Sequence, residues 1–490
     1  MMNKKRRAIA LSCIVLHSSF CILFSGCGPR RTPDLTRIFT AARTRTGKRP
    51  VIVVPGILGS RLVNRRTGEV VWPSAFRSET DGLGLPLSPD LAANHDDLVP
   101  ERIIETAKLL KYGPEVYVYH ELLKALRTFG GYRDGDWDNP GPDGDHDTLY
   151  IFAFDWRRDN VESARELIRK IEALKQKLNR PDLRFNIVAH SMGGLVARYA
   201  ARYGDADLPA DDEAPQITWA GARDINKIFM FGTPNEGSMD ALATLLDGYS
   251  VNEGLRPHLH LFKKISREDI VTSPAIFQLL PHGGALRFLD DNLAPLNVDL
   301  YDPVTWQRYH WSTLNEADYR ARFKAGLLRD EKVPRPAGDP AVIDAYLAAV
   351  LTRARRFHRA LDAVSQTPEP VALYAFGGDC EETLAAPVIL RDAKTNDWQT
   401  LTKPRALHDA DGRTHTRAEV LRAMYAPGDG RVTRDSLIGT QLSDVHRSPL
   451  FDTALPLAYA LFICDLHSGL QKNKTLQDNA ITLLINELTN

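Results

Sequence analysis

The chain has 490 residues, of which 62 are basic and 62 are acidic, and 43% of its residues are hydrophobic. The balanced charge gives no reason to expect a nucleic-acid partner or a strongly acidic one. The hydrophobic share is that of a globular protein. A chain of this length can bury a large core, so we expect one elaborated domain.

Residues 1–27 have the organisation of an export signal. A basic stretch precedes an apolar run over residues 8–24, and small residues then lead to Cys27. The letters LFSGC, which end at Cys27, resemble a bacterial lipobox. The apolar run is short for a membrane-spanning helix.

This segment therefore predicts an exported lipoprotein of the bacterial cell envelope. Acyl chains on Cys27 would hold the protein on a membrane surface, and the polar, basic residues 28–49 would form a tether. A plain signal peptide, which would leave a secreted protein, and a transmembrane anchor are the alternatives.

Two cysteines remain once this segment is set aside. Of the five cysteines, Cys13, Cys21 and Cys27 belong to the segment, which leaves Cys380 and Cys464. In an oxidising compartment the two could pair. Two buried free thiols are the alternative.

Strands and helices alternate along most of the remaining chain. Short apolar runs, typical of buried strands, predict strands at 50–56, 149–154, 185–189, 225–231, 370–376 and 459–464. Apolar residues at helical spacing predict helices at 115–126, 161–178, 195–204 and 341–364. The alternation indicates an α/β fold in which helices cover both faces of a mostly parallel central sheet.

Two stretches interrupt the alternation. Residues 238–367 are mixed and aromatic, and an insertion of this size after a core strand is interpreted as a cap, or lid, over an active site. Residues 61–110 predict a smaller, loop-rich insertion. The sheet would then be built from residues 50–237 and 368–490.

A serine lies between the predicted strand at 185–189 and the helix that follows. The pentad Ala189-His-Ser-Met-Gly193 resembles the G-x-S-x-G nucleophile elbow, with alanine in place of the first glycine. Such a turn holds the hydroxyl clear of the backbone, beside the N-terminus of a helix. A glycine turn with an ordinary serine would give the same letters, but the flanking strand and helix favour Ser191 as a nucleophile.

A serine nucleophile needs a base and a carboxylate that orients the base, and in α/β-hydrolases the acid precedes the histidine along the chain. Asp429, in a Gly-Asp-Gly turn, and His467, just past the last predicted strand, are the best candidates. Both lie on loops that follow strands, where a parallel sheet places its site. Asp379 competes with Asp429, and His446 competes with His467. His190 is a poor candidate for the base because its side chain should point away from that of the serine.

The oxyanion of a tetrahedral intermediate needs hydrogen-bond donors. We expect one from the backbone N–H of Met192, the residue after the nucleophile. The second should come from the turn Pro55–Gly59 after the first strand, where Ile57 is the candidate.

An acidic, glycine-containing loop at residues 134–147 has none of these roles. Alternating carboxylates could bind Ca²⁺ through their oxygens, although the downstream glutamate of an EF-hand is absent. An acidic loop that faces water is the alternative.

Short motifs follow one another from about residue 50 to residue 470. They are VIVVPGILGS (51–60), VW (71–72), EVYVY (115–119), FDWR (154–157), AHSMGG (189–194), FGTPNEGS (231–238), TSPAIF (272–277), GDGRV (428–432) and His467. In this order they resemble the lecithin:cholesterol acyltransferase family, which includes lysosomal phospholipase A2 and phospholipid:diacylglycerol acyltransferases. Two positions depart from the family's pattern, since Ala189 and Arg431 stand where glycine and threonine are usual.

The resemblance implies site residues and a substrate class. It implies Ser191, Asp429 and His467 as a catalytic triad, with the amides of Ile57 and Met192 as the oxyanion hole. It implies a lipid ester as substrate and places Trp72 in a lid region, where the indole would touch an acyl chain. Asp155 and Arg157 match the family's D-W-R and are interpreted as structural.

We therefore expect an α/β-hydrolase that acts on lipid esters through an acyl-enzyme, as a phospholipase A or an O-acyltransferase. Water or a lipid alcohol would accept the acyl group, and the chemistry requires no metal or organic cofactor. The expected partners are a hydrophobic ester and a membrane surface, with no nucleic acid. A hydrolase of non-lipid esters or lactones, and a catalytically inactive surface binding protein with a hydrolase fold, are the alternatives.

Overall fold

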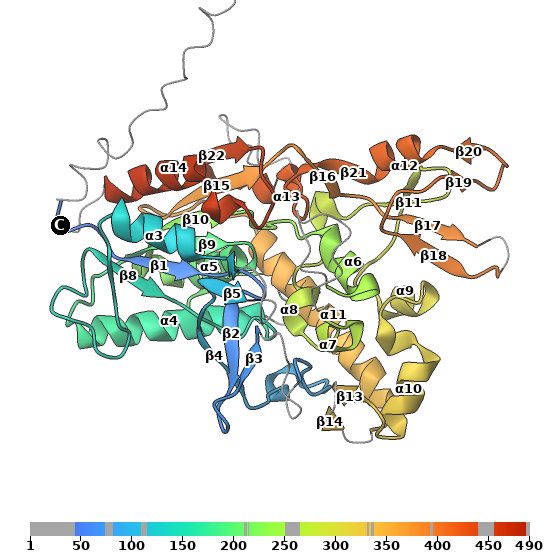
Figure 1. Ribbon diagram of the computed structural model, residues 1–490, viewed down its shortest axis with the longest axis horizontal. Helices are drawn as coiled ribbons and strands as arrows, with labels where there is room; N and C mark the ends of the chain where they lie inside the picture. The colour runs from blue at the N-terminus through green and yellow to red at the C-terminus, as the bar shows by residue number, and fades with distance from the viewer. Residues whose placement is uncertain are drawn as a thin grey trace, which may run out of the picture. The chain divides into compact units, whose positions relative to one another are not determined.

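A seven-stranded parallel sheet forms the core of the computed structural model (Figure 1). The structure describes residues 45–73, 82–108, 115–209, 213, 215–249, 265–330, 333–334, 338–392, 395–439 and 455–486. The strand order is β22-β15-β10-β9-β1-β8-β7, and each neighbouring pair is parallel. These strands are β1 (Val51–Val54), β7 (Arg133–Asp134), β8 (Thr148–Ile151), β9 (Phe185–His190), β10 (Ile225–Phe231), β15 (Ala372–Gly378) and β22 (Leu457–Ile463).

The central strand of the sheet, β9, and its neighbour β1 have the composition of strands that are covered on both faces. Every residue of β1 (VIVV) and of β9 (FNIVAH) is buried. Parallel strands between two helical layers show such continuous apolar runs, because neither face of the sheet meets water. The residue that follows β9 therefore leaves the sheet near its centre.

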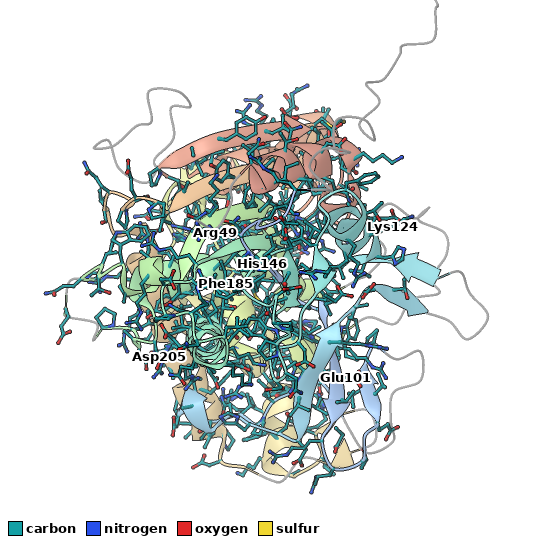
Figure 2. The ribbon with its side chains drawn as sticks, turned by 90° about the vertical axis from the view of Figure 1, so that its left-hand side faces the viewer. Arg49, Glu101, Lys124, His146, Phe185 and Asp205 are labelled. Carbon is teal, nitrogen blue, oxygen red and sulfur yellow. A yellow bond between two sulfur atoms is a disulfide. The ribbon has the colours of Figure 1, made fainter. Side chains whose placement is uncertain are left out.

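Helices cover both faces of this sheet. They are α3 (His120–Thr128), α4 (Asn160–Lys177), α5 (Met192–Tyr203) and α14 (Lys474–Ile485). Helix α5 packs against β9, β10 and α4, whereas α3 packs against α14. Figure 2 shows Lys124 of α3 and Asp205, which follows α5, on opposite sides of the sheet. The predicted α/β fold with a mostly parallel central sheet is confirmed.

The edge where the strands begin and the edge where they end carry different residues. Figure 2 shows Arg49, His146 and Phe185 together near the middle of the view, at the edge where β1, β8 and β9 begin. The opposite edge holds the carboxyl ends of the strands, from which Ser191 follows β9 and His467 follows β22. Ligand sites of open α/β sheets lie at this carboxyl edge.

The described residues between 238 and 367 form an inserted layer that is mainly helical. Its helices are α6 (Met239–Asp247), α7 (Arg267–Ile270), α8 (Pro274–Phe277), α9 (Pro303–Arg308), α10 (Ala317–Lys324) and α11 (Pro340–Asp362). A four-stranded sheet, in the order β12-β11-β17-β18, joins β11 (Phe288–Leu289) and β12 (Pro295–Leu296) to β17 (Val388–Arg391) and β18 (Trp398–Leu401). Strands β17 and β18 thus pair with the inserted layer. The sequence predicts instead that residues 368–490, which include these strands, belong to the hydrolase core.

Two buried arginines attach the end of α11 to the helix that follows Ser191. Arg198 donates to the carbonyl of Leu361, and Arg202 donates to the carbonyls of Ala360, Leu361 and Ala363. The last carbonyls of a helix have no partner within the helix, so the guanidinium groups satisfy them. Both guanidinium groups are shielded from water, since Arg198 and Arg202 are 2% and 6% exposed, and burial lowers the pKa of Arg198 to about 9.

The insertion at residues 61–110 contains more strand than its sequence predicts. β2 (Ser60–Asn64) lies between β3 (Val70–Trp72) and β4 (Leu98–Ile103) in an antiparallel sheet. Short strands thus interrupt the loops that the sequence predicts here, and the alternating partial burial of β2 indicates a sheet with one covered face.

The helix predicted at 115–126 begins later than expected. Residues Glu115–Tyr117 form β6, which pairs with β5 (Thr106–Lys108), and α3 starts at His120. Valine and tyrosine favour strands, and the pairing with β5 decides the local structure. The remaining elements are β13 (Arg329–Asp330), β14 (Val333–Pro334), β16 (Glu381–Leu384), β19 (Leu407–His408), β20 (Thr414–His415), α12 (Arg417–Met424), β21 (Tyr425–Gly428) and α13 (Arg434–Ile438).

The N-terminal predictions lie outside the described residues. These are the export signal, the lipidated Cys27 and most of the tether at 28–49. Among the helices in the described ranges, none combines the length and the apolar character needed to cross a membrane.

Candidate active site

Ser191 lies on a strained turn between β9 and α5. Its backbone has a φ of 53° and a ψ of −126°, a conformation that non-glycine residues rarely adopt and that clusters at functional sites. The turn closes tightly because two glycines follow. A Cβ on Gly193 would lie 2.4 Å from the Pro55 carbonyl oxygen, and one on Gly194 would lie 2.0 Å from Thr233 Oγ1.

The structure brings Ser191, His467 and Asp429 together. Ser191 Oγ lies 3.0 Å from His467 Nε2, and His467 Nδ1 lies 2.8 Å from Asp429 Oδ2. All three residues are buried. A carboxylate can only accept a hydrogen bond, so the proton of the neutral imidazole lies on Nδ1. Nε2 is then free of a proton and accepts a hydrogen bond from the serine hydroxyl.

The carboxylate of Asp429 is held by its own turn. Its second oxygen, Oδ1, accepts hydrogen bonds from the N–H groups of Arg431 and Val432 at 3.0 and 2.7 Å. In addition, the N–H of His467 donates to the backbone carbonyl of Asp429 at 2.8 Å. The acid and the base are therefore joined through both side chain and backbone.

The competing candidates differ clearly in their surroundings. Asp379 is exposed, and its backbone N–H donates to Ile463 at 3.2 Å. His446 lies outside the described residues. Asp429 contacts a buried imidazole. Asp379 makes no such contact among those described for it.

The turn predicted to supply an oxyanion donor lies against the nucleophile. A Cβ on Gly56 would come within 2.8 Å of Ser191 Cβ, so Ile57, the next residue, lies beside the elbow. Met192 is the first residue of α5, where backbone N–H groups have no acceptor within the helix. Trp72 donates from Nε1 to the Leu58 carbonyl at 2.9 Å, which ties β3 to the same turn.

Sequence reasoning missed two residues beside the triad. The hydroxyl of Tyr119 lies 2.9 Å from His190 Nδ1, and the imidazole of His190 is 5.0 Å from that of His467, measured between ring centroids. Burial and the neighbouring His467 lower the pKa of His190 to about 3. Their positions in the sequence could have indicated this, because Tyr119 ends the EVYVY motif and His190 directly precedes the nucleophile.

Cys380 and Cys464 form a disulfide. Cys380 directly precedes Glu381, which pairs with Gly428 beside Asp429, and Cys464 lies three residues before His467. The bond therefore links the start of β16, whose partner strand β21 ends beside Asp429, to the end of β22, which leads to His467. Within the described ranges, the one group of His, Cys, Asp and Glu side chains spaced closely enough to share a metal ion contains both of these bonded cysteines together with Glu381.

Arg431, which stands where threonine is usual in the motif, has a partner on the inserted layer. Arg431 lies 2.5 Å from Asp240 of α6, measured from its Nη1 to a carboxylate oxygen, and its guanidinium lies 4.6 Å from the centre of the Tyr249 ring. The loop that carries Asp429 is thereby fastened to the first helix after residue 238.

Ion pairs surround two other features of the sequence, the D-W-R stretch and the acidic loop at residues 134–147. Arg157 is buried and pairs with Asp155 at 2.7 Å and Asp96 at 2.6 Å, so the D-W-R stretch is a buried ion-pair cluster. In the acidic loop, Asp143 pairs with Arg133 and Asp145 pairs with Arg180. The side chains of these two aspartates therefore face cations of the chain itself.

Comparisons with known proteins bear on the family and the fold of this chain. The family model of lecithin:cholesterol acyltransferase matches residues 104–320, a range that includes Ser191 but ends before Asp429 and His467. The structure of a Tle4-Tli4 complex aligns with a TM-score of 0.55 and 14% identity, over 90% of this chain and 99% of that chain. A structure of EstA from Clostridium botulinum aligns over 91% of this chain and 90% of that chain at 12% identity, with a TM-score of 0.32 that is too low to bear on the fold.

No curated protein matches the sequence. The resemblance to the lecithin:cholesterol acyltransferase family is confirmed by the family match, and the first structural likeness shows the fold. The family match supports a lipid esterase or acyltransferase in general.

The contact between Gly56 and Ser191 gives a direct prediction. In Gly56→Ala the new methyl group must push the turn away from the nucleophile, so we expect hydrolysis of a p-nitrophenyl ester to fall about 100-fold, the scale of a 1 Å misplacement. Gly141→Ala is the matched control, because a Cβ there meets no atom within 4 Å. Activity of Gly56→Ala within twofold of the wild type would contradict this placement of the turn.

The pKa of His190 gives a second prediction, on stability. The unfolded chain binds a proton at His190 below about pH 6.5, whereas the folded chain does so only near pH 3. The stability that the neutral ring contributes is therefore present above pH 6.5 and is lost as the pH falls from there toward 3. We expect the free energy of unfolding of His190→Asn, measured with urea, to fall less steeply than that of the wild type as the pH is lowered through this window. The difference should reach up to about 1.4 kcal/mol per pH unit. Equal slopes in the two proteins would contradict the low pKa.

Proposed function

We infer that this chain, an α/β-hydrolase that resembles the lecithin:cholesterol acyltransferase family, is a serine-dependent lipid esterase or acyltransferase. The observation that carries the proposal is the pair of hydrogen bonds on His467, at 3.0 Å to Ser191 and at 2.8 Å to Asp429. Three residues from distant parts of the chain meet at the carboxyl edge of the sheet in the order that α/β-hydrolases use.

In the proposed reaction Ser191 attacks the acyl carbonyl while His467 Nε2 takes the hydroxyl proton. Asp429 holds the imidazole in the required tautomer and stabilises its cationic form. The N–H groups of Ile57 and Met192 donate to the oxyanion. His467 then returns the proton to the leaving alcohol, and an acyl-enzyme remains.

The second half-reaction transfers the acyl group from Ser191 to an acceptor. His467 removes a proton from water or from a lipid alcohol, and the acceptor oxygen attacks the acyl carbonyl. The bond between the acyl carbon and Ser191 Oγ then breaks, and His467 returns the proton to Oγ. Water gives a fatty acid, as in a phospholipase A, and an alcohol gives a new ester, as in an O-acyltransferase. The family match supports a lipid as the acyl donor, and Trp72 beside the Pro55–Gly59 turn is a candidate for contact with the acyl chain.

Product analysis tests this proposal. Wild-type protein with mixed phospholipid vesicles should release fatty acid and lysophospholipid, and an added long-chain alcohol should divert acyl groups into a new ester. Ser191→Ala should lower both products by at least about 10³-fold. Mass spectrometry of the products, with and without the alcohol, also gives the partition between the two acceptors.

Two results would redirect the assignment. A preference for p-nitrophenyl acetate over the decanoate would indicate a hydrolase of non-lipid esters. Absence of labelling of folded protein by a fluorophosphonate probe would indicate a binding protein without catalysis.

We also propose that the protein is an exported lipoprotein. The bond between Cys380 and Cys464 supports export, because disulfides persist in oxidising compartments. Cys27→Ser should move the protein from the membrane fraction to the soluble fraction of the cell envelope. Membrane partitioning equal to that of the wild type would contradict acylation at Cys27.

A further inference from the structure

A buried tyrosine–histidine pair lies beside the triad and has no part in the reaction proposed above. Tyr119 and His190 are 1% and 9% exposed. The N–H of Gly56 donates to Tyr119 Oη at 2.9 Å, and Tyr119 Oη lies 2.9 Å from His190 Nδ1. At the far side of the ring, His190 Nε2 lies 3.3 Å from the carbonyl oxygen of His467.

The hydrogen-bond partners determine where the protons lie in this chain of contacts. The carbonyl of His467 can only accept, so His190 Nε2 carries a proton and donates. The buried ring is neutral, and its Nδ1 is therefore the acceptor for the hydroxyl of Tyr119. Tyr119 in turn accepts from Gly56, so each of these groups has a partner of the right kind.

The network reaches the three parts of the proposed site from three distant segments. Gly56 precedes the candidate oxyanion donor Ile57, His190 precedes Ser191, and the bonded carbonyl belongs to His467 itself. A further contact joins the same segments, because Gln471 donates to the carbonyls of Val118 and Ser468 at 3.1 and 3.2 Å.

We propose that Tyr119 and His190 are positioning residues, which hold the oxyanion turn and His467 in register with Ser191. The inference rests on the proposed function. Neither side chain needs to touch the substrate, since Tyr119 acts through the backbone of Gly56 and His190 acts through the backbone of His467. The pair should therefore affect the transition state, where these groups bear charge, more than the binding of the ester.

Tyr119→Phe is the first test. The variant keeps the ring, which lies edge-on to His190 with centroids 5.7 Å apart, and removes the oxygen that accepts from Gly56. We expect kcat for p-nitrophenyl decanoate to fall about 10- to 100-fold with KM within twofold. The inhibition constant of an alkylboronic acid, whose adduct on Ser191 carries a tetrahedral oxygen, should rise by a similar factor.

Tyr150→Phe is the matched control. Tyr150 is also buried, and its hydroxyl donates to the Gly144 carbonyl at 2.8 Å, outside the network. This variant should lose comparable thermal stability and keep kcat and the boronate affinity of the wild type.

His190→Asn tests the same network from its other end. The shorter amide keeps an acceptor for Tyr119 and loses the reach to the His467 carbonyl, so kcat should again fall with little change in KM. The double variant with Tyr119→Phe should lose far less than the product of the two single losses, because both residues act through one connected unit. If Tyr119→Phe does not fold, the single variant His190→Asn tests the positioning role by itself.

The outcomes separate the network from the enzyme assignment. If wild type is active, Ser191→Ala is inactive and the variants at 119 and 190 keep kcat and boronate affinity, the positioning role is wrong and the proposed function stands. A rise in KM with unchanged kcat, or losses equal to those of Tyr150→Phe, would also overturn it. If wild-type protein neither turns over esters nor reacts with a fluorophosphonate, the proposed function itself fails.

Discussion

The imidazole of His467 is hydrogen-bonded on both sides inside a buried site, and the proposed chemistry depends on that arrangement. A serine hydroxyl is a weak nucleophile until a base lies within hydrogen-bonding distance of its proton. The 3.0 Å contact with Ser191 supplies the distance, and the 2.8 Å contact with Asp429 fixes the tautomer. Both contacts hold only while three loops, which leave three different strands, keep their mutual positions.

Several features of the structure oppose independent movement of those loops. The Ser191 turn has a strained backbone that only small neighbours permit, and Gly193 and Gly194 provide the space. The disulfide between Cys380 and Cys464 joins the start of β16, which pairs with the strand that leads to Asp429, to the end of the strand that leads to His467. Strain of this kind persists when the surrounding contacts over-determine the backbone. The same reasoning gives a purpose to the polar network through Tyr119 and His190, which crosses between the loops without meeting the substrate.

Sequence patterns were sufficient for the features that have a local or ordered signature. Continuous apolar runs located every strand of the central sheet except the short edge strand β7. The motif order along the chain pointed to Asp429 and His467, which lie within hydrogen-bonding distance of one another and of Ser191 in the structure. Features that depend on contacts between distant segments were not accessible. The bond from Tyr119 to His190, the pairing of the 388–401 hairpin with β11, and the choice between strand and helix at residues 115–117 each depend on a neighbour supplied from elsewhere in the chain. Local propensity cannot report such neighbours.

The central claim is that Ser191 carries the acyl group during turnover. Rapid acid quench of the protein mixed with a phospholipid, followed by proteolysis and mass spectrometry, measures this directly. The account predicts a peptide containing Ser191 whose mass is raised by one fatty acyl group within the first turnover, with much slower acylation in Asp429→Asn. Turnover without an acylated peptide, or with the acyl group on another residue, would contradict it.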